Sequence, residues 1–278
     1  MKSLLLRYLF LCCLCCFFQG GFAAGTVVSW QAPKGAGLNN DFTVKVRSEG
    51  KSKWVLVPTY LVKVDEVRET KHHVEHASMA TFDFSEKVEI AVTYNKGKID
   101  SARVRPLSYD IPFTIEGNTL RFSLEKPANL SVEVNGDIFH NLHLFANPLD
   151  TFKVDKKNPD LIYFGPGIHR FEGGEFRIPS GKTVYVAGGA VMMGRMLIEN
   201  VHDVKLLGRG IIDPSVKMGI RIANSRNVTG SYTMCYGWFG QCYHSKCKSH
   251  QLFWLGRWDE CVFQPERIVR QGILPDIG

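Results

Sequence analysis

Residues 184–191 (VYVAGGAV) and residues 204–211 (VKLLGRGI) repeat one phrase, in which a short β-branched strand meets a glycine turn and a second strand. A second pair, residues 198–204 (IENVHDV) and 222–228 (IANSRNV), repeats at a spacing of 24 positions. Repeats at such spacing are typical of a solenoid, whose coils bury their apolar faces against each other. We therefore predict the coils of a parallel β-helix. The alternative is a plain antiparallel β domain with chance similarity.

The turns of this pattern suit sharp changes of direction between short strands. Glycine accepts positive φ, and asparagine tolerates the left-handed region while bonding to nearby backbone. Asn200 and Asn224 occupy matching positions, so we expect their side chains to stack from coil to coil. The glycines at 188–189 and 208–210 have no helix after them, which favours turns over phosphate-binding loops.

The part of the chain before this pattern is also rich in short strands. Its strand-like runs are residues 44–46, 54–57, 60–64, 88–92, 121–124 and 130–134. No stretch has a convincing helical period, and turns such as residues 116–118 and 135–137 separate the runs. We predict an all-β chain, with a β-sandwich at residues 24–150 and the start of a right-handed parallel β-helix at residues 151–229.

The first 23 residues have the pattern of a signal peptide. Lys2 and Arg7 precede an apolar run at residues 8–18, which is too short to span a membrane well. No small residue precedes a cysteine in this run, which disfavours the alternative of a lipoprotein signal. We predict export to the periplasm or the outside, with no stable membrane insertion. Part of the net charge of +7 lies at the two ends of the chain, so we expect no binding of nucleic acid. We also expect a monomer.

Composition changes abruptly after Thr229. Four of the eight cysteines lie in the first 23 residues, and the other four gather at positions 235, 242, 247 and 261. Residues 230–278 contain no strand–turn phrase, and we interpret them as a frameshifted tail. The possible codons of this segment can be read in a frame shifted forward by one nucleotide. In that frame, the codons for residues 240–252 permit the sequence of an ordinary β-helix coil, and the codons for residues 273–278 permit a pair of aspartates. A zinc cluster of these cysteines with His244 and His250 is the alternative, but no paired Cys-x-x-Cys spacing supports it.

The chain resembles secreted bacterial glycoside hydrolases with a right-handed β-helix, the polygalacturonase-like family 28 and the dextranase-like family 49. The resemblance rests on residues 141–148 (NLHLFANP), 163–169 (YFGPGIH) and 207–213 (LGRGIID), and it covers roughly residues 30–228. It implies a pectin-lyase-like fold, a polysaccharide substrate and cleavage by aspartates. It also places those aspartates in coils after Val228, so the catalytic residues of this chain stay unknown and the helix is C-terminally truncated.

Four residues of the predicted coils are candidates for substrate binding. They are Arg195, Arg209, Asp213 and Arg221. The three arginines among them would face an acidic polysaccharide, with ordinary surface positions as the alternative. We expect no cofactor and no metal. Three histidines at positions 72, 73 and 76 lack the zincin order and are interpreted as part of a solvated loop, whereas His140 and His143 are expected to pack.

Three functions are compatible with the sequence. The first is hydrolysis of a polysaccharide by acid/base chemistry with inversion, which two positioned carboxyl groups perform. The second is a non-catalytic carbohydrate-binding or structural remnant. The third is a lyase on the same scaffold, which needs basic residues and often calcium.

Overall fold

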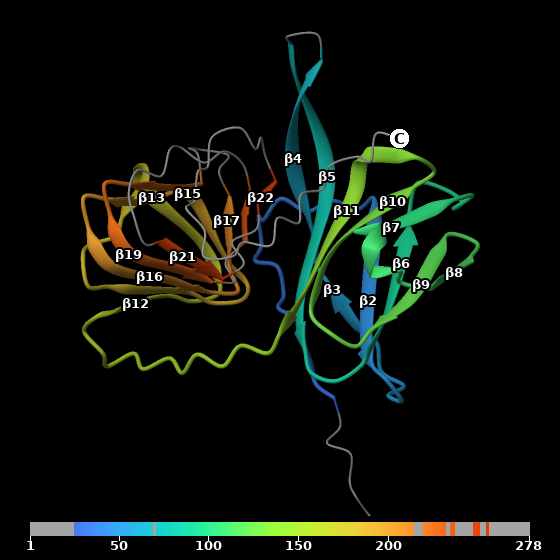
Figure 1. Cartoon of the computed structure of the whole chain (residues 1–278), viewed down its shortest axis with the longest axis horizontal. Helices are drawn as coiled ribbons and strands as arrows, with labels where there is room; N and C mark the ends of the chain where they lie inside the picture. Colours follow the sequence, from blue (N-terminus) through green and yellow to red (C-terminus); the bar gives the residue numbers. More distant parts are fainter. Residues whose placement is uncertain are drawn as a thin grey trace, which may run out of the picture.

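The computed structural model describes residues 25–68, 71–213 and 219–231, together with the backbone of residues 234–236, 247–250 and 254–255. Two β lobes lie side by side, with the chain running from the first into the second (Figure 1). Apart from the 3-10 turn Leu107–Tyr109, every described element is a strand. The predicted all-β class is therefore confirmed. Among the described residues, no helix has the length and apolar character needed to span a membrane.

The N-terminal lobe contains two sheets. One has the order β1-β5-β11-β10-β7 with β4 also on β5, and the other has the order β3-β2-β6-β9-β8. The strands of the first are β1 (Val27–Val28), β4 (Thr59–Arg68), β5 (Lys71–Phe84), β7 (Ala102–Arg105), β10 (Ala128–Val134) and β11 (Asp137–Pro148). Those of the second are β2 (Phe42–Ser48), β3 (Val55–Val57), β6 (Val88–Tyr94), β8 (Phe113–Glu116) and β9 (Thr119–Leu124).

Alternation along the strands builds the core of this lobe. In β2, Phe42, Val44 and Val46 are buried, whereas Lys45 between them is exposed. The same period of two directs apolar residues of both sheets into one shared cluster, which includes Phe82 and Leu144. Five of the six strand-like runs of the sequence lie within strands of this lobe, and the run at residues 54–57 begins one residue before β3.

The hairpin of β4 and β5 rises beyond the rest of the lobe (Figure 1). Its antiparallel register continues to the pair Arg68↔Lys71. His72, His73 and His76 therefore lie in a strand, and the predicted loop is wrong. The sequence misled because charged residues and histidines dominate this stretch, whereas the pairing of β5 with β4 is made by backbone hydrogen bonds.

The second lobe is a solenoid of parallel strands. One sheet has the order β12-β14-β16-β19-β21, and the other has the order β13-β15-β17-β20-β22, with β18 on β15. The strands are β12 (Leu161–Phe164), β13 (Gly167–Arg177), β14 (Thr183–Val186), β15 (Ala190–Glu199), β16 (His202–Gly208), β17 (Ile211–Asp213), β18 (Ile220–Ala223), β19 (Arg226–Ser231), β20 (Met234–Tyr236), β21 (Cys247–His250) and β22 (Trp254–Leu255). The β-helix predicted from the repeats is confirmed.

The registers test the repeat spacing directly. Ile198 pairs with Ile222, which confirms the spacing of 24. Val184 pairs with Leu206 instead of Val204, so the true spacing there is two residues longer than the sequence suggested. A shift by two keeps every side chain on the same face of the strand, which is why the sequence pattern alone did not reveal it.

The turns of the solenoid use the residues that the sequence indicated. Asn200 and Asn224 both have positive φ, at 57° and 46°. Gly208 has a φ of 120°, and a Cβ there would lie 2.0 Å from the carbonyl oxygen of Val186 in the preceding coil. Only glycine allows the two coils to approach so closely at this point.

Parallel pairing continues past the predicted boundary at residue 229. β19 ends at Ser231, and β20, β21 and β22 add further parallel pairs to β17, β19 and β20. The side chains of these last three strands, and most of residues 232–278, lie outside the described part. The frameshifted tail and the signal peptide therefore stay predictions.

Candidate polysaccharide-facing residues

Arg195 lies on β15, and its register partner on β13 is Glu175. The guanidinium Nη1 donates to Glu175 Oε1 at 3.0 Å, with side-chain exposures of 15% and 23%. The sheet thus sets an arginine and a glutamate of successive coils directly side by side. Neutralisation by Glu175 weakens the attraction that Arg195 would exert on an anionic chain.

Arg221 belongs to a second ionic cluster, in which its partner Glu199 lies diagonally on β15, because the register partner of Arg221 is Leu197. Nη2 of Arg221 lies 3.4 Å from Glu199 Oε1, and Nη1 of Arg177 lies 3.4 Å from Glu199 Oε2. One carboxylate therefore bridges arginines of two other strands. Charges of both signs therefore meet on this face of the sheet, which stabilises stacked coils more than it forms a basic patch. Arg221 keeps a side-chain exposure of 44% and stays accessible.

Arg209 occupies a different environment from the other three candidates. It is buried between the lobes, where its Nε lies 2.7 Å from both carboxylate oxygens of Asp83 on β5, and both side chains are only 2% exposed. Its Nη2 also donates to the carbonyl oxygen of Pro148 at 2.8 Å. This corrects the expected role of Arg209, because a guanidinium enclosed between two lobes does not reach a polysaccharide at the surface.

Two further polar residues complete this buried network. The Tyr185 hydroxyl donates to Asp150 Oδ2 at 2.6 Å, and the Asp150 backbone N–H donates to Asp83 Oδ2 at 3.1 Å. Burial raises the pKa of Asp83 above its usual value, against the opposing effect of Arg209. Burial, and then the hydrogen bond to Asp150, raise the pKa of Tyr185. These residues hold the lobes together. No sequence pattern marks this network, since Asp83 and Arg209 are 126 positions apart.

Apolar packing surrounds the network. Tyr60, Val62 and Phe145 of the first lobe share a cluster with Val191 and Ile211 of the solenoid. A Cβ on Gly188 would lie 2.2 Å from the ring of Trp30, so the indole of the first lobe rests on bare backbone of a coil. The solenoid is therefore docked by both apolar and ionic contacts.

Asp213, the fourth candidate, ends β17. It is half-buried, and in register it lies beside Met193 of β15. The chain leaves the described part directly after it, so its candidate role in substrate binding stays a prediction. The three arginine candidates therefore lie in separate ionic contacts, with Glu175, Glu199 and Asp83 respectively for Arg195, Arg221 and Arg209.

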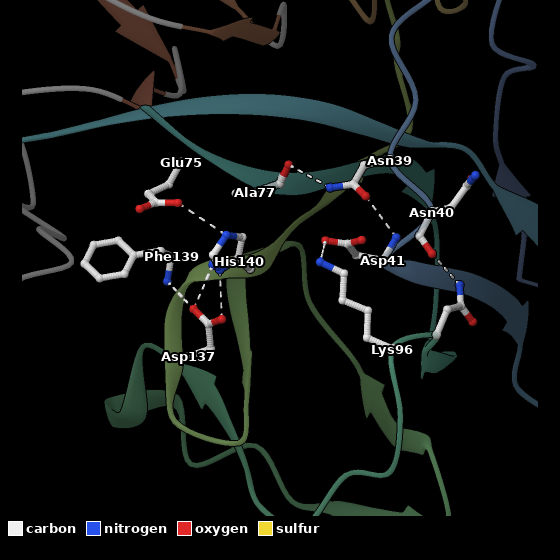
Figure 2. Close-up of polar contacts among 10 residues, drawn as sticks. Asn39, Asn40, Asp41, Glu75, Ala77, Lys96, Asp137, Phe139 and His140 are labelled. Carbon is white, nitrogen blue, oxygen red and sulfur yellow. Dashed lines mark hydrogen bonds and ion pairs between the residues drawn. The ribbon is translucent and has the colours of Figure 1, made fainter. Parts of the chain in front are cut away.

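A second polar cluster surrounds His140 at the start of β11 (Figure 2). His140 Nε2 lies 3.3 Å from Glu75 Oε2 on the β4–β5 hairpin, and Nδ1 lies 2.9 Å from Asp137 Oδ2. Burial acts to raise the pKa of Asp137, but hydrogen bonds from the backbone and side chain of His140 outweigh it and lower that pKa. The cluster fixes the base of the hairpin against β11.

His143 is buried in the same strand, in agreement with the packing role expected for it. Burial lowers its pKa to about 4, so its imidazole is neutral at physiological pH. In the described part of the chain, no three His, Cys, Asp or Glu side chains gather in a way that suits a metal ion. The side chains of the alternative cysteine–histidine zinc cluster lie outside that part.

Comparisons with known proteins agree with the architecture. The sequence matches no protein-family model, and no curated protein is similar to it. Among solved structures, the fold is similar to Dex49A from Penicillium minioluteum, with a TM-score of 0.56 and 14% sequence identity. Dex49A is a dextranase of glycoside hydrolase family 49 with a right-handed β-helix. The similarity covers 82% of this chain and 60% of Dex49A, so this chain spans less than two thirds of its neighbour. At this identity, the likeness establishes the β-helix fold alone.

Proposed function

We propose that this chain is the scaffold of a polysaccharide-directed glycoside hydrolase, of the polygalacturonase- or dextranase-like kind, and that its substrate is a polysaccharide. The observation that carries the proposal is the likeness to Dex49A over 82% of the chain, which extends across both lobes. Such enzymes need a carboxylic acid to protonate the leaving oxygen and a carboxylate to activate water. We propose that aspartates in coils after Val228 have these roles in the intact lineage.

The buried contacts between the lobes support this proposal. Asp83, Arg209 and Tyr185 dock the solenoid on the first lobe in a fixed position. A rigid scaffold suits glycoside hydrolysis because the separation of two carboxyl groups decides its course. Coils stacked at about 4.8 Å set the spacing of side chains in fixed steps, and the separation of about 6.5–9.5 Å that inversion requires needs a diagonal pair or more than one such step.

A non-catalytic remnant is the second candidate, and the paired charges of the solenoid favour it. Glu175 and Glu199 both bind arginine at the surface of the solenoid, so neither has the environment of an acid/base catalyst. In the described coils the carboxylates on this surface therefore stabilise the fold.

The test compares two versions of the gene. The DNA between the codons for Val228 and Cys235 is sequenced, and the frame is then restored by one nucleotide. Both proteins are assayed for new reducing ends on dextran and on polygalacturonan. Activity in the restored protein alone supports the hydrolase and the frameshift together. A clean read in the present frame, with tryptic peptides covering residues 235–261, refutes the frameshift. Sequencing of the mature N-terminus tests the proposed export, which requires removal of about the first 23 residues.

A further inference from the structure

The outer face of the β3-β2-β6-β9-β8 sheet carries an aromatic platform that the hydrolase proposal does not use. Trp54 lies next to β3, and its indole is half-buried. The Arg47 guanidinium carbon lies 4.5 Å from its ring centroid, and that of Arg121 lies 5.7 Å away. Arg121 belongs to β9, so the indole and this arginine approach each other across β2 and β6.

Two features of the sheet allow Arg121 and Arg47 to lie beside the Trp54 indole: a small residue on β6 and an ion pair that holds Arg47. Ala91 of β6 pairs with both Lys45 and Arg121, and it is only 6% exposed although it points away from the core. Arg47 Nη2 binds Glu89 Oε2 at 2.7 Å, which holds the guanidinium beside the indole. The platform is therefore ordered before any ligand arrives, which lowers the entropic cost of binding.

Unpaired cations surround the platform. Lys45 is exposed on the same face, and Lys51 and Lys53 are exposed in the turn that joins β2 to β3. Across the part of the chain that the structure describes, none of these three lysines has an ion-pair partner. The carboxylates of this face are already engaged, since Glu89 binds Arg47 and Glu116 lies 3.5 Å from Arg121. The face thus combines a ring with an excess of positive charge.

We propose that this face, centred on Trp54, binds a polysaccharide chain that bears carboxylates. Trp54 is only half-buried, and the part of the indole that the guanidinium groups of Arg47 and Arg121 leave uncovered offers an apolar surface to a pyranose ring. Aromatic side chains of this kind dominate contact energies in binding sites. Lys45, Lys51 and Lys53 attract the carboxylates of successive sugars. The proposal concerns binding alone, so it holds or fails separately from hydrolysis.

Binding of the full chain is measured by titration calorimetry with oligogalacturonate, at low and at physiological salt. Dextran oligomers of matched length test for a neutral glycan, and a single-stranded oligonucleotide tests for nucleic acid. We expect oligogalacturonate to bind more tightly than both, with an affinity that falls as salt rises.

Trp54→Ala should weaken this binding by about tenfold or more, which corresponds to the loss of one well-packed aromatic contact. Trp54→Phe should recover part of the loss. The double substitution Lys45→Ala and Lys53→Ala should weaken binding and also flatten its salt dependence. Two controls carry the same substitutions elsewhere: Tyr109→Ala removes another exposed ring, and Lys98→Ala removes another exposed lysine.

Several outcomes overturn the proposal. One is equal binding of dextran or of the oligonucleotide. Another is unchanged affinity in a Trp54→Ala protein that keeps the wild-type unfolding midpoint. If that variant fails to fold, the lysine variant decides, and an affinity equal to that of Lys98→Ala refutes the proposal.

Discussion

Arg209→Met should destabilise the protein more than any other single charge removal at the described surface or interface. The substitution keeps an unbranched side chain of similar length but leaves the Asp83 carboxylate without its cation. Both partners are 2% exposed, and breaking such a buried pair costs about 3–5 kcal/mol. Loss of the hydrogen bond to Pro148 adds to this cost and places the expected value toward the upper end.

The matched control is Arg195→Met. Its ion pair with Glu175 is more exposed, at 15% and 23%, and solvent screening limits its expected effect to about 1 kcal/mol. A second control removes both charges of the buried pair, by Asp83→Asn with Arg209→Met. Replacement of a whole buried pair is often close to neutral, so the double variant should recover much of the loss.

Urea unfolding measures these differences, because the free energy of unfolding falls linearly with denaturant. The sign of the pH dependence follows from the pKa of Asp83, which burial raises in the folded state and which Arg209 opposes. Without Arg209 the pKa rises further, so the folded variant binds a proton more tightly than the unfolded chain. The loss is then greatest at neutral pH and shrinks as pH falls through the raised pKa toward about 4.

Two results would refute this reasoning. A loss in Arg209→Met no larger than that in Arg195→Met would show that the interface does not depend on the pair. A loss that stays constant or grows on acidification would show that an uncompensated Asp83 carboxylate is not its cause.

Three further predictions concern the turns and a buried histidine. Gly208→Ala should cost several kcal/mol in chemical denaturation because its Cβ would lie 2.0 Å from a carbonyl oxygen, whereas Gly50→Ala, also at positive φ but with nothing within 4 Å, should cost about 1 kcal/mol. Asn224→Val should lower the free energy of unfolding by about 1–3 kcal/mol and Asn224→Gly should not, since the residue has a φ of 46°; equal effects in both variants would contradict this. The pKa of His143 is lowered to about 4, so its contribution to stability is present above about pH 6.5 and is lost as pH falls toward 4. Between pH 6.5 and pH 4, the free energy of unfolding of His143→Leu should therefore fall by about 3 kcal/mol less than that of the wild type, as measured by urea titration. The same pH profile in both proteins would exclude this role for His143.

The sequence determined the class of fold and the conformation of its turns. The β-branched repeats predicted parallel coils, and Ile198 indeed pairs with Ile222. Asparagine at positions 200 and 224 predicted left-handed turns, and both residues have positive φ. These features are local, since strand alternation and turn chemistry depend on neighbouring residues. The chain therefore encodes them where they occur.

Only the tertiary structure decided what the charged and aromatic side chains do. Arg209 looked like Arg195 and Arg221 in the sequence, yet it is buried against Asp83, while the others form ion pairs with glutamates of other coils. Trp54 appeared as one more strand residue until β9 brought Arg121 to its ring. The physical reason is that the energy of a charge or a ring depends on burial and on partners distant in sequence, and folding alone brings those partners together.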